Sequence, residues 1–93
     1  MSNVILKGYI TVLDSDLVLV KKHLVEHVEL TNQENGCLMF EVLQDKININ
    51  QFSVYEEFVD KCAFEMHQLR VSKSEWGAVT KNVERHYVIS GNG

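Results

Sequence analysis

One long helical stripe lies between segments that alternate like β-strands, and this order restricts the fold more than any other feature of the sequence. Residues 4–13 are rich in β-branched and aromatic residues, and both alternating sets are largely apolar, which is typical of a strand covered on both faces. From 14 to 33, apolar residues recur at spacings of three and four, which predicts an amphipathic helix. The polar residues 14–16 suit its start, and Gly36 suits a left-handed cap after its end.

The second half of the chain predicts a hairpin followed by a shorter helical region. Residues 37–43 and 52–59 have strand composition and are separated by a polar turn, so we expect them to pair. Asp60 is expected to cap a short helix, and residues 69–73 are expected to be irregular. Ser74 can begin one or two further helical turns.

Residues 83–90 alternate as a last strand, so the predicted order is β-α-β-β-α-β. This is the split βαβ, or ferredoxin-like, arrangement, an α+β fold with an antiparallel sheet and helices on one face. The 93 residues predict a single domain over 1–93. The second sheet face is also predicted to be apolar, and 45% of the residues are hydrophobic, a large share for a small interior. We therefore expect two sheets to pair in a homodimer, with a densely packed monomer as the alternative.

The charge balance argues against nucleic acid and membranes as partners. The chain has 13 acidic and 9 basic residues, a net charge of −4 and no Lys/Arg-rich stretch, whereas phosphate binding needs a clustered positive field. No apolar run approaches the roughly 20 residues of a membrane span, and the N-terminus does not have the pattern of a secretory signal. Cys37 and Cys62 fit neither a disulfide framework nor a zinc pattern, so we expect reduced thiols in a cytoplasmic protein.

Several short motifs occur in an order that resembles a known family. Residues 34–42, ENGCLMFEV, resemble the E-P-G-C-L-x-F-E-V stretch of the antibiotic biosynthesis monooxygenase family, with asparagine in place of the usual proline. Residues 52–60, FSVYEEFVD, are similar to its F-x-x-Y-E-x-(aromatic)-x-D strand. Ala63 and His67 match its A-x-x-x-H helix, and Trp76 falls where the family often has tryptophan.

The resemblance implies a dimeric α+β barrel with a pocket between the sheet and the helices of each subunit. It also implies oxidation of electron-rich aromatics, such as hydroquinones, by molecular oxygen without a metal or flavin. Some members instead isomerise small sugar-derived signalling molecules. After His67 many members have a serine and then a histidine–aromatic pair, and Arg70, Ser72 and Lys73 stand at those places here. We therefore expect a different, more cationic pocket rim.

Oxygenation without a cofactor needs a base that makes an electron-rich substrate anion in a dry pocket. His67 is the best candidate for that base, because its ordinary pKa lies near 6.5. The alternative is a histidine that hydrogen-bonds a backbone carbonyl. Glu56 is the second catalytic candidate. It shares a predicted strand face with apolar residues, where a carboxylate must be paired or protonated. It can orient His67 or bind substrate, although we favour a structural pair with Arg85.

Five residues are candidates for substrate binding. Trp76, Tyr55 and Phe40 are expected to form a pocket wall, because aromatic rings stack on aromatic substrates. Trp76 is equally suited to the core or an interface, and Tyr55 to an exposed edge. Asn32 can offer an amide donor or cap the helix C-terminus. Arg70 can bind a phosphate or carboxylate, which would favour an isomerase, or simply lie on a solvated face.

His23 and His27 are four residues apart on the predicted helix, a spacing that can place two imidazoles on one metal. No further ligand completes the set, so neither a metal nor a cofactor is expected. Three functions follow from the sequence. The first is a cofactor-independent monooxygenase acting on a small quinol. The others are an isomerase of a small anionic metabolite and a non-catalytic dimeric module that binds a ligand.

Overall fold

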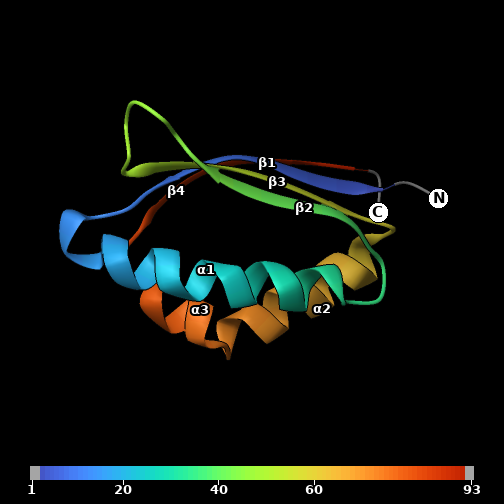
Figure 1. Cartoon of the computed structure of the whole chain (residues 1–93). Coiled ribbons are helices and arrows are strands. Elements are labelled where there is room, and N and C mark those ends of the chain that lie inside the picture. Colours follow the sequence, from blue (N-terminus) through green and yellow to red (C-terminus); the bar gives the residue numbers. More distant parts are fainter. Residues whose placement is uncertain (1–2, 92–93) are drawn as a thin grey trace.

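A four-stranded sheet lies against a single layer of helices in the computed structural model, which describes residues 3–91 (Figure 1). In chain order the elements are β1 (Val4–Thr11), the 3₁₀ turn η1 (Asp14–Asp16), α1 (Leu17–Asn32), β2 (Cys37–Gln44), β3 (Gln51–Phe58), α2 (Lys61–Ser72), α3 (Glu75–Val79) and β4 (Glu84–Ser90). The predicted β-α-β-β-α-β order is therefore confirmed, with α3 as a short addition to the second helical region.

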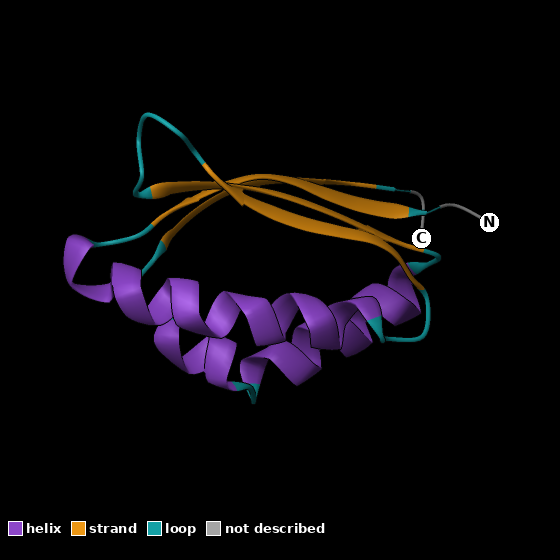
Figure 2. Cartoon of the chain, in the orientation of Figure 1, coloured by secondary structure: helices purple, strands orange, loops and turns teal. Residues whose placement is uncertain are grey.

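The sheet has the order β2-β3-β1-β4, and each neighbouring pair of strands is antiparallel. Figure 2 shows that all the helices lie on one face of this sheet. This is the ferredoxin-like α+β arrangement that the sequence predicts. It encloses an interior between sheet and helices, where a hydrophobic core of buried side chains is found: Leu6, Ile10, Val12, Val20, Phe52, Val54 and Val83.

The register of β3 decides which side chains enter the interior. Phe52, Val54, Glu56 and Phe58 are all buried, as expected for alternate residues on the face covered by helices. Glu56 lies opposite Phe40 of β2 and Leu6 of β1, in the middle of the sheet. A carboxyl group is therefore placed among apolar side chains.

The region expected to be irregular, residues 69–73, belongs mostly to α2, which continues to Ser72. The sequence-based expectation was wrong because this segment lacks an apolar stripe of its own. The last turns of α2 are instead stabilised by side chains: Arg70 binds Glu34 and Thr31, and the Ser72 hydroxyl donates to the Leu69 carbonyl at 2.7 Å. Ser74 then caps α3, as predicted.

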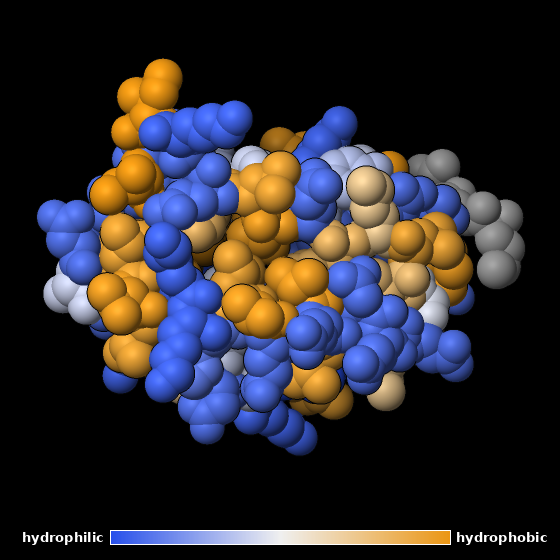
Figure 3. All heavy atoms as spheres, viewed as in Figure 1, coloured by the Kyte–Doolittle hydropathy of each residue, from blue (hydrophilic) through white to orange (hydrophobic). Residues whose placement is uncertain are grey.

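The outer face of the sheet is mixed in character, and not apolar throughout as expected. Leu43 and Val88 are exposed there, but the Glu57 carboxylate accepts hydrogen bonds from the Tyr55 hydroxyl and the Asn3 amide at 3.1 and 2.7 Å. The loop between β2 and β3 projects beyond this face (Figure 1). Figure 3 shows hydrophobic atoms at that projection, where Ile47 is 95% exposed.

Candidate functional site

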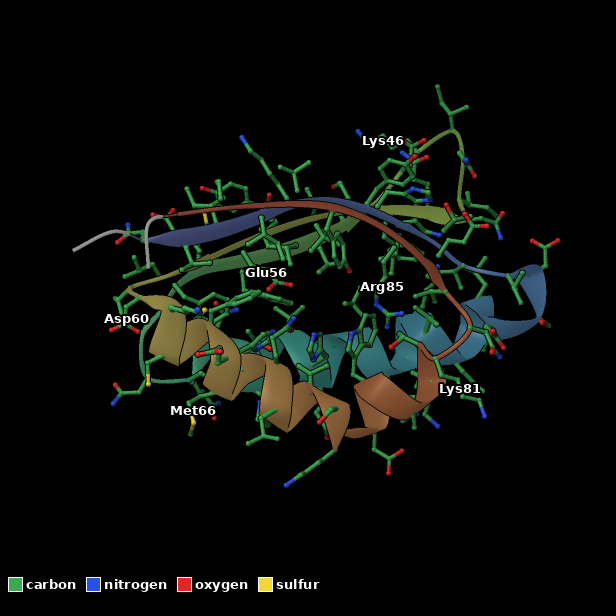
Figure 4. All side chains as sticks on the ribbon, turned by 180° about the vertical axis from the view of Figure 1, so that it is seen from behind. Lys46, Glu56, Asp60, Met66, Lys81 and Arg85 are labelled. Atoms are coloured by element: carbon green, nitrogen blue, oxygen red, sulfur yellow. The ribbon has the colours of Figure 1, made fainter. Side chains whose placement is uncertain are left out.

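A small cavity of about 30 Å³ lies between the sheet and the helices. Its walls combine aromatic side chains (Phe40, Trp76 and Tyr87) with the titratable or charged side chains of His27, Glu56 and Arg85. Figure 4 shows Glu56 and Arg85 reaching into the space between the layers. A cavity of this size has room for about one water molecule. An aromatic substrate would therefore require the surrounding side chains to move.

Glu56 is the most unusual group in this cavity. Its side chain is buried, and among residues 3–91 no hydrogen-bond partner is present for its Oε1 atom. Burial, with a smaller contribution from the negative charge of Glu34, raises the pKa of Glu56 to about 7. The carboxyl group is therefore close to half protonated near neutral pH, the condition in which one group can both accept and return a proton.

The favoured pair between Glu56 and Arg85 is not formed. Arg85 instead donates to the carbonyl and hydroxyl oxygens of Thr80 at 3.1 and 3.2 Å. The reason is the register: Arg85 lies opposite Ile10 of β1, whereas Glu56 lies opposite Leu6. Four residues along a strand correspond to roughly 13 Å.

His67 extends from α2 into the boundary between the layers and is only 2% exposed. Its Nδ1 atom lies 2.7 Å from Oε1 of Glu34, and its Nε2 atom lies 3.7 Å from Oε1 of Glu56. The alternative expectation of a bond to a backbone carbonyl is therefore wrong. Burial lowers the pKa of His67, while the charge of Glu34 and its hydrogen bond act in the opposite direction. The imidazole is thus held between two carboxyl groups.

Glu34 is the site residue that sequence reasoning missed. It follows α1 and contacts two α2 side chains, because Arg70 also donates from Nε to its Oε2 atom. Nη2 of Arg70 donates to the Thr31 hydroxyl at 2.9 Å. The sequence did contain a signal for a carboxylate partner: His67 and Arg70 are three residues apart and so share one face of a helix. Two such side chains can bind the same carboxylate.

His27 forms the helix side of the cavity. Its ring stacks on Trp76, with centroids 4.6 Å apart and an interplanar angle of 6°, and meets the edge of Phe40 at 5.1 Å. Burial, followed by the positive charges of His67 and Arg70, lowers the pKa of His27 to about 3. Its Nδ1 atom has no hydrogen-bond partner within the described part of the chain. His27 is therefore a neutral ring with a free polar atom.

The five predicted substrate-binding residues fall into two groups. Phe40 and Trp76 line the cavity, as expected. Tyr55 does not, because it lies on the outer face and donates to Glu57. Asn32 does not either: it is exposed at the end of α1, and its amide donates to the Val28 carbonyl at 3.0 Å. The structural role considered for Asn32 at the helix C-terminus agrees with this contact.

Arg70, the fifth residue, lines a separate open hollow of about 720 Å³ beside the first turns of α2. Glu34, Asp60 and His67 line the same hollow, and Figure 4 labels Asp60 and Met66 at this end of the molecule. The charge of Arg70 is opposed by Glu34, and Asp60 adds a negative charge. The cationic rim expected around Arg70 is therefore not formed.

The geometry as a whole provides acid–base chemistry in a nearly dry, aromatic-walled space. Glu56 offers a carboxyl group that changes its charge near neutral pH, and His67 presents Nε2 toward it. Perturbed titratable groups beside a cavity are the usual mark of a functional site. In residues 3–91, no group of three or more His, Cys, Asp or Glu side chains is arranged to hold a metal ion.

Residues 4–70 match the family model described as Antibiotic biosynthesis monooxygenase, which is more than half of the chain. The chain therefore belongs to the antibiotic biosynthesis monooxygenase family. This membership supports a general monooxygenase-like role. No sequence among the curated proteins matches the chain. Within residues 3–91, every helix is too short or too polar to serve as a transmembrane span.

Solved structures of other proteins share the fold over nearly their whole length. A protein from Pseudomonas aeruginosa is 23% identical with a TM-score of 0.73, and the match covers 99% of this chain and 93% of that one. A protein from Nitrosomonas europaea, described as a candidate antibiotic biosynthesis monooxygenase, is 17% identical with a TM-score of 0.72 over 100% and 97% of the two chains. A third structure, of an antibiotic biosynthesis monooxygenase, is 20% identical with a TM-score of 0.71 over 100% and 97%. These likenesses show the fold alone.

Proposed function

We propose that this protein is a cofactor-independent monooxygenase that oxidises a small electron-rich aromatic, such as a hydroquinone, with molecular oxygen. The observation that carries the proposal is the buried, unpartnered Oε1 atom of Glu56, which lies 3.7 Å from Nε2 of His67 beside an aromatic-walled cavity. Family membership supports the monooxygenase-like part of the proposal. The aromatic walls of the cavity support an aromatic substrate.

The reaction begins with proton removal. Nε2 of His67 accepts the proton of a substrate hydroxyl, which leaves an electron-rich aromatic anion. The anion passes one electron to oxygen, and the resulting radical and superoxide combine into a peroxide anion on a ring carbon, which takes the proton held by His67 and becomes a hydroperoxide. The hydroperoxide loses water, so the substrate gains one oxygen atom and loses two hydrogens. In this step neutral His67 removes the hydrogen of the ring carbon as the O–O bond breaks, Glu56 in its protonated form supplies the proton that makes water the leaving group, and His67 passes its new proton to Glu56.

The residues that line the cavity beside Glu56 suit binding of the anion. Trp76 and Phe40 provide flat apolar surfaces for an aromatic ring. Burial raises the pKa of Tyr87 to about 12, so its hydroxyl keeps its proton and can donate to a substrate oxygen. The Nδ1 atom of His27 has no hydrogen-bond partner among the described residues, so it is free to form a hydrogen bond with the substrate. A nearly closed space also keeps water away from the reactive anion.

The same proposal includes a cytoplasmic homodimer in which two outer sheet faces meet. Leu43, Val88 and Tyr9 are exposed on that face and would be covered by the second copy. Charged residues on the same outer face, such as Lys7 and Glu57, would then be covered as well and would need partners across the interface. Sedimentation analysis would show the mass of two chains, and the mass of one chain would overturn this part.

The test is oxygen uptake by purified, metal-stripped protein with a panel of hydroquinones. We expect uptake above the autoxidation background, lost in His67→Ala and kept in His23→Ala, a control histidine on α1. Uptake that survives in His67→Ala would overturn the role of this base. No uptake on any panel member would overturn the oxygenase proposal.

The other two functions have weaker structural support. An isomerase of an anionic metabolite would need free positive charge, and Arg70 is bound to Glu34. Turnover of a small phosphorylated substrate without oxygen would nevertheless favour it. A ligand-binding module without catalysis would show saturable binding of a hydroquinone and no product, since binding needs only the aromatic walls around Trp76.

A further inference from the structure

Glu34 is held in place by a tight turn between α1 and β2. Gly36 has a φ of +89°, and a Cβ atom there would lie 2.6 Å from Cβ of Ala63 on α2. The turn is closed by hydrogen bonds from Cys37 N to the Glu34 carbonyl at 3.2 Å and from Val59 N to the Gly36 carbonyl at 2.8 Å. The backbone of Glu34 is therefore fixed against α2, where its side chain finds its partners.

Both oxygens of the Glu34 carboxylate are used by α2. Oε1 meets Nδ1 of His67 at 2.7 Å, and Oε2 accepts from Nε of Arg70. Arg70 is itself held by Thr31 through the 2.9 Å bond from Nη2. An ionised carboxylate only accepts hydrogen bonds, so the proton in this contact belongs to His67.

The position of that proton decides what the other side of the ring can do. A neutral imidazole carries one proton, so with Nδ1 protonated the Nε2 atom has a free lone pair. Nε2 is also the ring atom that faces Glu56, at 3.7 Å. Glu34 lines the open hollow, whereas Glu56 lines the inner cavity. His67 itself lines the open hollow, where Nδ1 contacts Glu34, and its Nε2 atom is directed toward Glu56 of the inner cavity.

We propose that Glu34 is a positioning residue that holds His67 in the tautomer with its proton on Nδ1, so that Nε2 is the atom that accepts the substrate proton. The inference rests on the proposed function for the role of His67 as the base. Glu34 does not touch the cavity and acts only through the ring. It also stabilises the imidazolium that forms when Nε2 gains a proton, as a carboxylate behind a catalytic histidine does.

Other charged or titratable groups face this pair from every neighbouring element. They are Cys37 on β2, Glu56 on β3, His27 on α1 and Arg70 on α2, and beside Glu56 in the cavity wall also Arg85 and Tyr87 on β4. Arg70 opposes the protonation of His67, and His27 is neutral. Arg85 donates to Thr80. Among the described residues, none of these groups lies within hydrogen-bonding distance of a ring nitrogen of His67, whereas Glu34 does.

The first test is ¹⁵N NMR of the His67 ring at mildly alkaline pH, where it is neutral, because protonated and bare ring nitrogens differ strongly in chemical shift. We expect a protonated Nδ1 and a bare Nε2 in the unmodified protein. Glu34→Gln should mix or reverse the tautomers. The glutamine amide has one oxygen that accepts and one NH2 group that donates, so it cannot accept hydrogen bonds from both His67 and Arg70 through separate atoms. Glu29→Gln, an exposed change on α1, should leave them unchanged.

A protonated Nε2 in the unmodified protein would overturn the inference without any variant. An unchanged tautomer in folded Glu34→Gln would overturn it as well. Neither result depends on turnover, so this inference and the proposed function can fail separately. Where turnover is present, Glu34→Gln should lower kcat about 10- to 100-fold, as when a group that orients a functional histidine is lost, with KM little changed. Glu34→Asp, which keeps the carboxylate, should recover part of the loss.

Discussion

Nε2 of His67 and Oε1 of Glu56 lie 3.7 Å apart, and Oε1 has no hydrogen-bond partner in the described chain. The separation is longer than a hydrogen bond by roughly 0.5 Å. Two groups that can carry a proton therefore face each other without forming a hydrogen bond. A substrate hydroxyl or a water molecule could bridge the two atoms after they move apart by about 0.8 Å, because an oxygen that is hydrogen-bonded to both needs roughly 4.5 Å between them.

Replacing Glu56 by glutamine should reduce catalysis without preventing folding. The amide has the shape of the carboxyl group but cannot exchange a proton, so oxygen uptake should fall by about 100-fold or more. Initial rates with the best hydroquinone measure the effect. Glu57→Gln on the outer face is the matched control, and it should keep at least half of the activity. An active Glu56→Gln protein would exclude Glu56 as the proton donor.

The same variant should change how stability depends on pH. The pKa of Glu56 is raised from 4.5 to about 7 in the folded protein, so the folded state binds more protons than the unfolded state between these values. This group therefore lowers the free energy of unfolding as pH rises from 4.5 to 7, by about 3 kcal/mol in total. Urea denaturation across this range should show the decrease in the unmodified protein.

Glu56→Gln lacks this group, so its free energy of unfolding should exceed that of the unmodified protein increasingly as pH rises to 7. Other titrating groups contribute to both proteins and cancel in the difference. A difference that stays constant across the range would mean that the carboxyl group is not desolvated as its position indicates.

His27 should produce the opposite dependence at lower pH. Its pKa is lowered from 6.5 to about 3, so the stability that it contributes is present above 6.5 and is lost as pH falls toward 3. His27→Phe keeps a ring beside Trp76 and cannot be protonated. The variant should therefore lose less stability than the unmodified protein between pH 6.5 and 3, by several kcal/mol. If the free energy of unfolding fell by the same amount in both proteins between pH 6.5 and 3, this prediction would be contradicted.

Gly36→Ala should destabilise the protein and disturb His67 together. The added methyl group would lie 2.6 Å from Cβ of Ala63, at a φ of +89° that L side chains rarely adopt. We expect a loss of about 1–3 kcal/mol, measured by thermal or urea unfolding, and the tautomer change described for Glu34→Gln. Asn35→Ala in the same turn is the control, since Asn35 is exposed. Equal stability of the two variants would show that the turn accommodates the added methyl group without strain.

The order of the elements was predictable because the signals are local. The stripe of α1 and the alternation of β1 and β3 come from neighbouring residues, as do the caps at Asp60 and Ser74. Glu56, Phe40 and Trp76 were identified from the sequence and line one cavity, and His67, identified in the same way, faces Glu56 from α2. The end of α2 was missed because Arg70 makes contacts with residues far away in the sequence, which no local pattern records.

The amino-acid sequence by itself determined that a carboxyl group would share one strand face with Phe52 and Phe58, since alternation along a strand needs no knowledge of its neighbours. Only the tertiary structure decided which partner each charged group would have. Glu34 and His67 are 33 residues apart and meet because the Gly36 turn packs against α2. Arg85 misses Glu56 because the pairing of β4 with β1 places it four residues away, and strand register is a property of the assembled sheet.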